Sequence, residues 1–176
     1  MKVNPEISAL ILIDFQGKLM PFIENGQEIV TQTKKISKIA KILNIPIVGT
    51  EQSPKSLGSN IAEISEFCDK TIIKEHFDAC EDSLIAAIPS GKTQLIIAGC
   101  ETHVCVMQTA LHLIKENFDV FMLVDALGSR KTLDKEIGIQ RLSQAGAKLI
   151  TTEMAAFEWL DSAQNPAFKE VLKLIK

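Results

Sequence analysis

Residues 9–14 read Ala-Leu-Ile-Leu-Ile-Asp, which is a run of five apolar side chains followed at once by a carboxylate. A strand with one face in water alternates apolar and polar residues, whereas an unbroken apolar run is typical of a strand buried on both faces. Such strands occur in parallel sheets that helices cover on both sides. This stretch therefore predicts a central strand of an α/β sheet, with Asp14 at its carboxyl end.

The same alternation of short apolar runs and helical segments continues along the chain. Apolar runs recur at residues 46–49, 71–73, 95–98, 120–124 and 148–150. Helical periodicity separates them at residues 27–43, 82–88, 104–114 and 134–145, and two more helices are expected to close the chain. We therefore expect a single α/β domain over residues 1–176, with a Rossmann-like, mostly parallel six-stranded sheet and helices on both faces.

Composition and charge exclude several classes of protein. The chain has 176 residues, 46% of them hydrophobic, and a formal charge of −3. No basic stripe with interleaved aromatic residues is present, so nucleic acid is not expected as a partner. The first six residues lack a signal-peptide pattern, and no apolar run approaches the roughly 18 residues of a membrane span. A cytoplasmic protein that does not bind membranes, with four cysteines as thiols, is expected.

Three of the expected strands are followed closely by a residue whose side chain can take part in a reaction. Asp14 follows the first strand, Lys74 follows the third, and Cys105 lies shortly after the fourth. Ligands of such sheets bind at the carboxyl ends of the strands, near the point where the strand order reverses. Taken singly, each has a structural explanation: a helix-capping carboxylate, an exposed lysine and a small core residue. Asp125, after residues 120–124, matches Asp14 by position alone.

Cys105 lies in residues 99–106, which read Gly-Cys-Glu-Thr-His-Val-Cys-Val. Thr102 is a plausible N-cap, which would place Cys105 in the first turn of a helix. Backbone N–H groups and the positive helix end lower the pKa of a thiol at that position and favour the thiolate. The ammonium of Lys74 could hold that thiolate, or an oxyanion that forms during a reaction.

Several motifs together resemble the isochorismatase-like cysteine hydrolases, a superfamily that includes nicotinamidases and N-carbamoylsarcosine amidohydrolases. The resemblance covers nearly the whole chain. It rests on Ile-Leu-Ile-Asp-Phe-Gln at residues 11–16, Ile-Lys at 73–74 and Glu-Thr-His-Val-Cys-Val at 101–106. Residues 50–52 (Thr-Glu-Gln), 109–111 (Thr-Ala-Leu) and 152–155 (Thr-Glu-Met-Ala) further resemble the isochorismatase domain-containing branch of this superfamily.

The resemblance implies a role for each residue of this set. Cys105 would be the nucleophile, Asp14 would take and return its proton, and Lys74 would stabilise the charged pair. A cis peptide bond between Cys100 and Glu101 is also implied, which would aim the N–H of Glu101, with that of Cys105, at the carbonyl oxygen under attack. The implied enzyme is a cofactor-free homo-oligomer that works through a covalent thiol intermediate.

One departure from the superfamily concerns metal binding. Metal-binding nicotinamidases carry an Asp-x-His type cluster after the second strand, but residues 50–54 read Thr-Glu-Gln-Ser-Pro here. The three histidines, His76, His103 and His112, lack the close spacing of metal ligands, and no Cys-x-x-Cys pair is present. We therefore expect no metal and no cofactor, and nicotinamidase activity becomes a weaker candidate.

The expected substrate is a small molecule, an amide or a related carbonyl compound. Proximity to the motifs makes Leu19, Gln52, Phe77 and His103 candidates for a small pocket, with His76 beside them. Hydrolysis of a vinyl ether, as by isochorismatase itself, is an alternative reaction, and a non-catalytic, metabolite-binding homo-oligomer is an alternative class. Dinucleotide binding is disfavoured because residues 14–17 read Asp-Phe-Gln-Gly, without a Gly-x-Gly-x-x-Gly motif.

Overall fold

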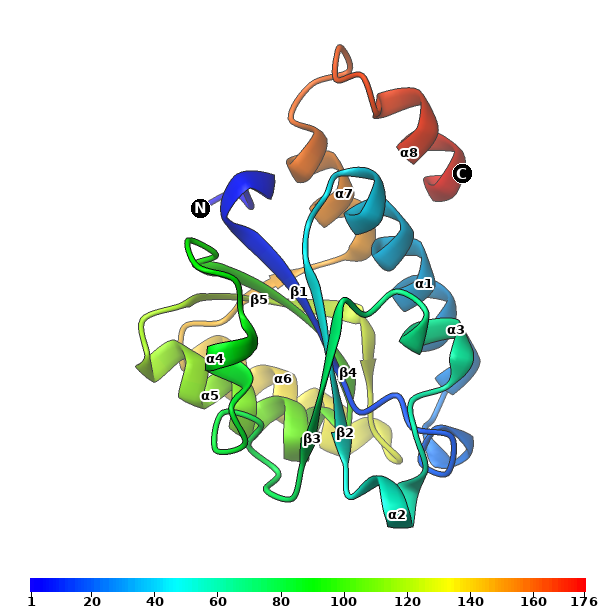
Figure 1. Ribbon diagram of the computed structural model, residues 1–176, viewed down its shortest axis with the longest axis vertical. Helices are drawn as coiled ribbons and strands as arrows, with labels where there is room; N and C mark the ends of the chain where they lie inside the picture. The colour runs from blue at the N-terminus through cyan, green and yellow to red at the C-terminus, as the bar shows by residue number, and fades with distance from the viewer.

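A six-stranded parallel sheet forms the centre of the molecule, as the sequence predicts (Figure 1). The computed structural model describes residues 1–176. The strands occur in the order β3-β2-β1-β4-β5-β6, and every neighbouring pair is parallel. Their bounds are β1 (Ser8–Ile13), β2 (Ile47–Gln52), β3 (Lys70–Lys74), β4 (Gln94–Cys100), β5 (Asp119–Gly128) and β6 (Lys148–Ile150).

Helices cover both faces of this sheet, so the molecule has three layers (Figure 1). One face carries α1 (Gly26–Ile42), α3 (Ala62–Ser65), α7 (Thr152–Leu160) and α8 (Phe168–Ile175). The other face carries α4 (Leu84–Ala87), α5 (Met107–Lys115) and α6 (Thr132–Gln144). The short elements are α2 (Pro54–Leu57), η1 (Pro5–Ile7), η2 (Met20–Phe22) and η3 (Thr102–Val106). No helix is long and apolar enough to cross a lipid bilayer.

Strand β1 shows why a continuous apolar run is needed in the middle layer. All six of its residues are buried. Leu10 and Leu12 belong to the hydrophobic core under α1, whereas Ile11 and Ile13 belong to the second core under α5. Because successive side chains of a strand point to opposite faces, a strand between two helix layers requires apolar residues at every position.

Gly99 allows β4 to approach β1 closely at the carboxyl end of the sheet. It is the register partner of Ile13 and has a φ of +143°. A Cβ atom at this position would lie 2.3 Å from the carbonyl oxygen of Ile13, which is far inside van der Waals contact. Only glycine fits both constraints, and the close approach brings the segment after β4 beside Asp14.

The strand order reverses at β1, whose neighbours are β2 on one side and β4 on the other. Strands β2 and β3 extend the sheet in one direction, and the chain then returns to continue it in the other. Such a reversal separates the loops that follow the two central strands and leaves a crevice beyond their carboxyl ends. This end of the sheet lies at the bottom of Figure 1, where α2 follows β2.

Several elements differ from their predicted form, and the largest differences concern two strands and one helix. Strands β2 and β5 continue to Gln52 and Gly128, beyond the predicted residues 49 and 124. The predicted buried stripe of α5 is also partly wrong. A π-helical turn, η3, precedes α5 and rotates the face that the helix buries. The residues buried there are Met107, Ala110 and Leu113, while Val104, Leu111 and Ile114 are only partly buried.

Candidate active site

Asp14 lies directly after β1 and is completely buried. Its backbone has a φ of +54°, an uncommon conformation for a residue other than glycine. The hydroxyl of Thr50, on β2, donates a hydrogen bond of 2.6 Å to Oδ1. The other oxygen, Oδ2, accepts no hydrogen bond and lies 2.8 Å from the Nζ atom of Lys74. Thr50 thus holds one carboxylate oxygen, and the other is paired with Lys74.

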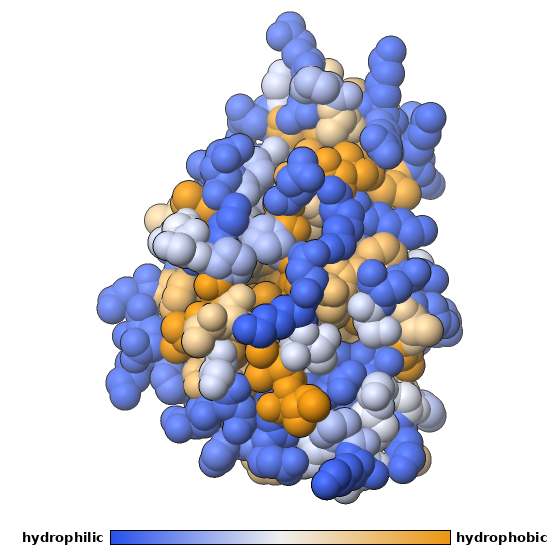
Figure 2. Space-filling view, in the orientation of Figure 1, coloured by the Kyte–Doolittle hydropathy of each residue, from blue (hydrophilic) through white to orange (hydrophobic).

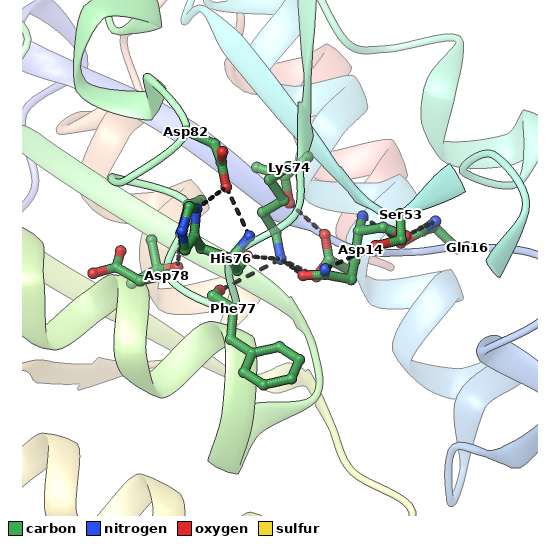
Figure 3. A network of polar contacts seen from close by, with 12 residues as sticks. Asp14, Gln16, Ser53, Lys74, His76, Phe77, Asp78 and Asp82 are labelled. Carbon is green, nitrogen blue, oxygen red and sulfur yellow. Dashed lines mark hydrogen bonds and ion pairs between the residues drawn. The ribbon is translucent and has the colours of Figure 1, made fainter. Parts of the chain in front are cut away.

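Lys74 is the last residue of β3, and its ammonium is buried. Nζ donates to the amide oxygen of Gln52 at 2.7 Å and to the backbone carbonyls of His76 and Phe77 at 3.3 and 3.4 Å. Figure 3 shows this side chain reaching from β3 towards Asp14. A buried ammonium is stable only when its charge and its donors are matched, and here three oxygens and a carboxylate surround it.

Gln52 holds Lys74 in place and is itself held by Gln16. It is the register partner of Lys74 across the parallel pair of β2 and β3. Its backbone N–H donates to Gln16 Oε1 at 2.8 Å, and its carbonyl accepts from Gln16 Nε2 at 2.9 Å. Its own amide nitrogen donates to the carbonyl of Glu75 at 2.9 Å. Gln52, which the sequence suggests as a pocket residue, thus contacts Lys74, and Gln16 holds its backbone in place.

Cys105 lies in the π-helical turn η3, directly before α5, and is 7% exposed. The predicted N-cap at Thr102 is wrong, because its hydroxyl donates to the carbonyl of Gly128 at 3.0 Å instead. Glu101 occupies the cap position of this turn and makes no side-chain capping bond. The thiol lies close enough to Asp14 and Lys74 for their charges to shift its pKa in opposite directions.

The expected lowering of the thiol pKa at the helix start is also wrong. Burial and the negative charge of Asp14 raise the pKa of Cys105, whereas Lys74 lowers it, and together they leave it at about 12. Desolvation of the thiolate thus outweighs the effect of the ammonium. At neutral pH the resting group is a thiol, so a nucleophilic reaction here requires a base that removes its proton as the sulfur attacks.

The peptide N–H of Glu101 points at no acceptor in the protein, neither backbone nor side chain. The bond that precedes it, Cys100–Glu101, is cis. The carboxylate of Glu101 accepts from the backbone N–H of Arg130 at 3.0 Å and from its Nε at 2.9 Å, which fixes the residue against the end of β5. The N–H of Cys105 makes no backbone hydrogen bond outside its own turn. The N–H of Glu101 is thus left without a partner in the protein at the end of β4.

The remaining pocket candidates lie in different surroundings. Leu19 is partly buried against the core under α1. The ring of Phe77 is exposed and points away from the polar network in Figure 3, although its carbonyl contacts Lys74. The ring of His103 faces the loop after β5, with Nδ1 at 3.0 Å from the hydroxyl of Ser129. The ring of His76 is exposed and pairs with Asp82 at 3.1 Å.

Asp125, which like Asp14 directly follows an apolar run in the sequence, has a structural role. Its carboxylate accepts hydrogen bonds from the backbone N–H of Thr152 at 3.0 and 3.1 Å and from its hydroxyl at 3.2 Å. These contacts satisfy N–H groups at the beginning of α7. The half-buried Lys135 is near enough to Asp125 for the two charges to interact, but no salt bridge joins them.

A cavity of about 630 Å³ lies away from these residues. The N-terminal segment, including Lys2 and Asn4, and the turn between α7 and α8 line it, at the upper end of Figure 1. Its lining includes none of Asp14, Lys74 and Cys105. The sole grouping of metal-ligating side chains, in the loop after β3 and on α5, also excludes these three residues.

Comparison with known proteins gives matches over nearly the entire chain. Residues 8–154 match the model of the isochorismatase domain family. Isochorismatase domain-containing protein 2A from Mus musculus is 34% identical, over 99% of this chain and 85% of its own length.

Solved structures of similar proteins have the same fold. The MAR1 ribonuclease from Caenorhabditis elegans is 35% identical, with a TM-score of 0.91, over 99% of this chain and 92% of that chain. The YcaC gene product from Escherichia coli, described as an octameric hydrolase of unknown specificity, is 29% identical, with a TM-score of 0.92, over 99% of this chain and 89% of that chain. The agreement in sequence and in three-layered fold places this chain in the isochorismatase family.

Proposed function

We propose that this chain is a cofactor-free cysteine hydrolase, in which Cys105 attacks a small amide or related carbonyl compound. The observation that carries the proposal is the buried ammonium of Lys74, 2.8 Å from Asp14 Oδ2 and close enough to Cys105 to lower its thiol pKa. A buried structural lysine needs a counter-ion such as Asp14, but it does not need a thiol beside that ion pair. A carboxylate, a cation and a thiol together form a set that can activate a nucleophile.

The first half of the reaction forms a covalent intermediate. Asp14 Oδ2, which accepts no hydrogen bond, takes the proton of the Cys105 thiol while the sulfur attacks the carbonyl carbon. The pair of electrons moves to the carbonyl oxygen, which accepts hydrogen bonds from the N–H groups of Glu101 and Cys105. Collapse of this tetrahedral species breaks the C–N bond, and the leaving nitrogen receives the proton from Asp14.

The second half of the reaction releases the acyl group. A water molecule gives a proton to Asp14 and attacks the thioester carbon, and the same two N–H groups stabilise the oxyanion. Breaking of the C–S bond returns the proton to the sulfur. Lys74 keeps its proton throughout, because its role is to balance the negative charge that Asp14 and the sulfur carry in turn.

A homo-oligomer is the proposed working form. Exposed apolar side chains gather in segments at the carboxyl ends of the strands: Phe22 after β1, Ile73 and Phe77 at β3, and Leu133 after β5. Figure 2 shows an apolar patch in the lower half of the view, bordered by hydrophilic residues. A second subunit over this end would cover these side chains and enclose a small substrate. The octameric E. coli relative supports this proposal.

The cytoplasm is the proposed location, because all four cysteines are free thiols. Cleavage of RNA, which the name of the C. elegans relative indicates for that protein, finds less support in this chain. The one cation beside the reactive groups, Lys74, is buried and fully engaged, and the chain has a net charge of −3. A buried and fully paired lysine is not available to bind a phosphate backbone.

A panel of small aliphatic and aromatic amides and N-carbamoyl compounds tests the proposal. The purified protein is incubated with each compound, released ammonia or amine is measured, and samples are quenched in acid for intact-mass analysis. We expect turnover of at least one compound and an acyl adduct that peptide mapping places on Cys105. Cys68→Ala, which removes a thiol outside the site, is the matched control. The assignment would be refuted by an adduct on another cysteine. It would also be refuted if both the native protein and Cys68→Ala turned over substrate without any thiol adduct.

A further inference from the structure

Asp78, Cys80 and His112 form a compact cluster outside the proposed active site. Asp78 and Cys80 lie in the loop between β3 and α4, and His112 lies on α5, 34 residues after Asp78. One carboxylate oxygen, one sulfur and one ring nitrogen lie within 4.8 Å of one another. The closest pair is His112 Nδ1 and Asp78 Oδ2, at 2.7 Å.

The backbone holds these three side chains together before any ligand binds. The N–H of Ala79, between two members of the cluster, donates to the hydroxyl of Thr109 on α5 at 3.0 Å. Asp78 Oδ1 also accepts from the N–H of Cys80 at 2.9 Å. The loop is thus fixed on the helix that carries His112, so the three potential ligands keep their separation without relying on long, flexible side chains.

Acidic groups surround Cys80. The negative charges of Asp78, Glu116 and Glu81 all act on its thiol. A divalent cation at this point would offset the repulsion between these acidic groups.

We propose that Asp78, Cys80 and His112 bind a zinc-like divalent transition-metal ion. Sulfur, imidazole nitrogen and carboxylate oxygen are the three ligand types that zinc accepts in proteins, at about 2.0–2.3 Å. Tetrahedral coordination at such lengths separates ligand atoms by roughly 3.3–3.8 Å, so the existing arrangement needs only small side-chain shifts. All three residues are partly exposed, which leaves a fourth position for water. On binding, the thiol proton leaves to solvent, and the ring nitrogen and the carboxylate turn from each other to the ion.

The position of the site suggests what the ion does. The carbonyls of His76 and Phe77, which accept from Lys74, belong to the same loop as Asp78. An ion that joins this loop to α5 therefore stiffens the backbone that holds the proposed catalytic cation. It touches no reacting atom, so its role is structural and not chemical. This consequence rests on the proposed function, whereas ion binding itself does not.

Cobalt(II) is a suitable probe, because it replaces zinc and gives a thiolate-to-metal absorption band when sulfur is a ligand. The full chain is first stripped with a chelator and then titrated with Co²⁺. We expect one equivalent to bind with a thiolate band, and added Zn²⁺ to displace it. Cys80→Ser should abolish the band, and His112→Gln should weaken Co²⁺ binding by roughly tenfold or more. Absence of the band in the native protein would overturn the proposal.

Two further variants separate this site from the active site. Cys68→Ser removes a half-buried thiol outside the cluster, and Cys105→Ala removes the proposed nucleophile. Both should keep the band with unchanged Co²⁺ affinity. A band that survives in Cys80→Ser and disappears in Cys105→Ala would place the ion at the active-site thiol and refute the proposal. Failure of the metal site and failure of the proposed function are distinguishable, because Co²⁺ binding is measured without substrate and is expected even in Cys105→Ala, which lacks the proposed nucleophile.

Discussion

Gln52 and Lys74 are register partners at the carboxyl ends of β2 and β3, and the amide oxygen of Gln52 accepts a 2.7 Å hydrogen bond from the lysine ammonium. The pairing of the two strands therefore sets the height at which the ammonium lies above the sheet. From β3, the lysine extends past β2 to reach Asp14, beyond the end of β1. Gln52 is in this sense a positioning residue, and its substitution has measurable consequences.

Gln52→Leu should lower hydrolysis by about 10²-fold, because the ammonium of Lys74 loses its shortest hydrogen bond and shifts from the thiol. The pH profile of Cys105 alkylation separates positioning from mere stability, since loss of the nearby cation raises the thiol pKa. Gln52→Glu restores an acceptor but adds a negative charge, so its alkylation profile should also move to higher pH. Unchanged profiles in both variants would remove Gln52 from this role.

Thr50→Val should destabilise the fold by about 1–3 kcal/mol, because Asp14 Oδ1 then loses its 2.6 Å hydrogen bond while it remains buried. The substitution nearly conserves volume, so a cavity does not explain the effect. Urea unfolding followed by circular dichroism measures the change. Thr50→Ser keeps the hydroxyl and should recover most of the loss; equal stability of the two variants would contradict the explanation.

Cys105→Ala should retain the fold and lose activity by at least about 10³-fold, because the nucleophile has no substitute. Far-UV circular dichroism and amide hydrolysis are the paired measurements. Cys68→Ala, Cys80→Ala and Cys100→Ala should each keep most of the activity. Turnover by purified Cys105→Ala at the native rate would refute the covalent mechanism.

The reactivity of Cys105 should increase with pH well into the alkaline range. Its pKa is raised to about 12 by burial and by the charge of Asp14, so the thiolate fraction at neutral pH is small. Iodoacetamide labelling across pH, mapped by mass spectrometry, measures the profile.

Two variants should move this profile in opposite directions. Lys74→Met removes the cation that lowers the thiol pKa, so labelling should shift to higher pH by more than about one unit. Asp14→Asn removes a charge that raises the pKa, and labelling should shift to lower pH. Shifts of the same sign in both variants would be incompatible with the charges described here.

Gly99→Ala should destabilise the fold by more than about 3 kcal/mol, because the new Cβ would lie 2.3 Å from the Ile13 carbonyl oxygen at a φ of +143°. Gly91→Ala is a useful comparison, since this residue also has a positive φ but has no atom near its Cβ position. Thermal unfolding of both variants separates backbone strain from steric overlap. Equal melting temperatures would mean that the steric overlap between β4 and β1 does not reduce the stability of the Gly99→Ala variant.

The sequence was sufficient to predict the sheet and the gathering of Asp14, Lys74 and Cys105. A run such as residues 9–13 is apolar at every position, and that pattern has few structural explanations. The parallel topology then brings the ends of separate strands to one edge. The motif resemblance distinguished Asp14 from Asp125, whose contacts with Thr152 follow from the three-dimensional packing of α7.

Other features depend on contacts between residues far apart in the chain. The length of β5 was underestimated because polar Asp125 interrupts its apolar run, although the strand continues to Gly128. Thr102 does not cap the helix, because its hydroxyl donates to the carbonyl of Gly128. The high thiol pKa of Cys105 follows from burial, which local sequence does not report.

The place of Lys74 at the border of the sheet has a consequence for how the protein loses function on heating. Strand β3 pairs with β2 alone, while β1 is paired on both sides. Edge strands open by local fluctuations that need less free energy than global unfolding. The amide hydrogens of β3 should thus exchange with solvent sooner than those of β1. Inactivation by heat should begin below the melting temperature and reverse on cooling, because the lysine can leave the site and return while the rest of the sheet stays folded.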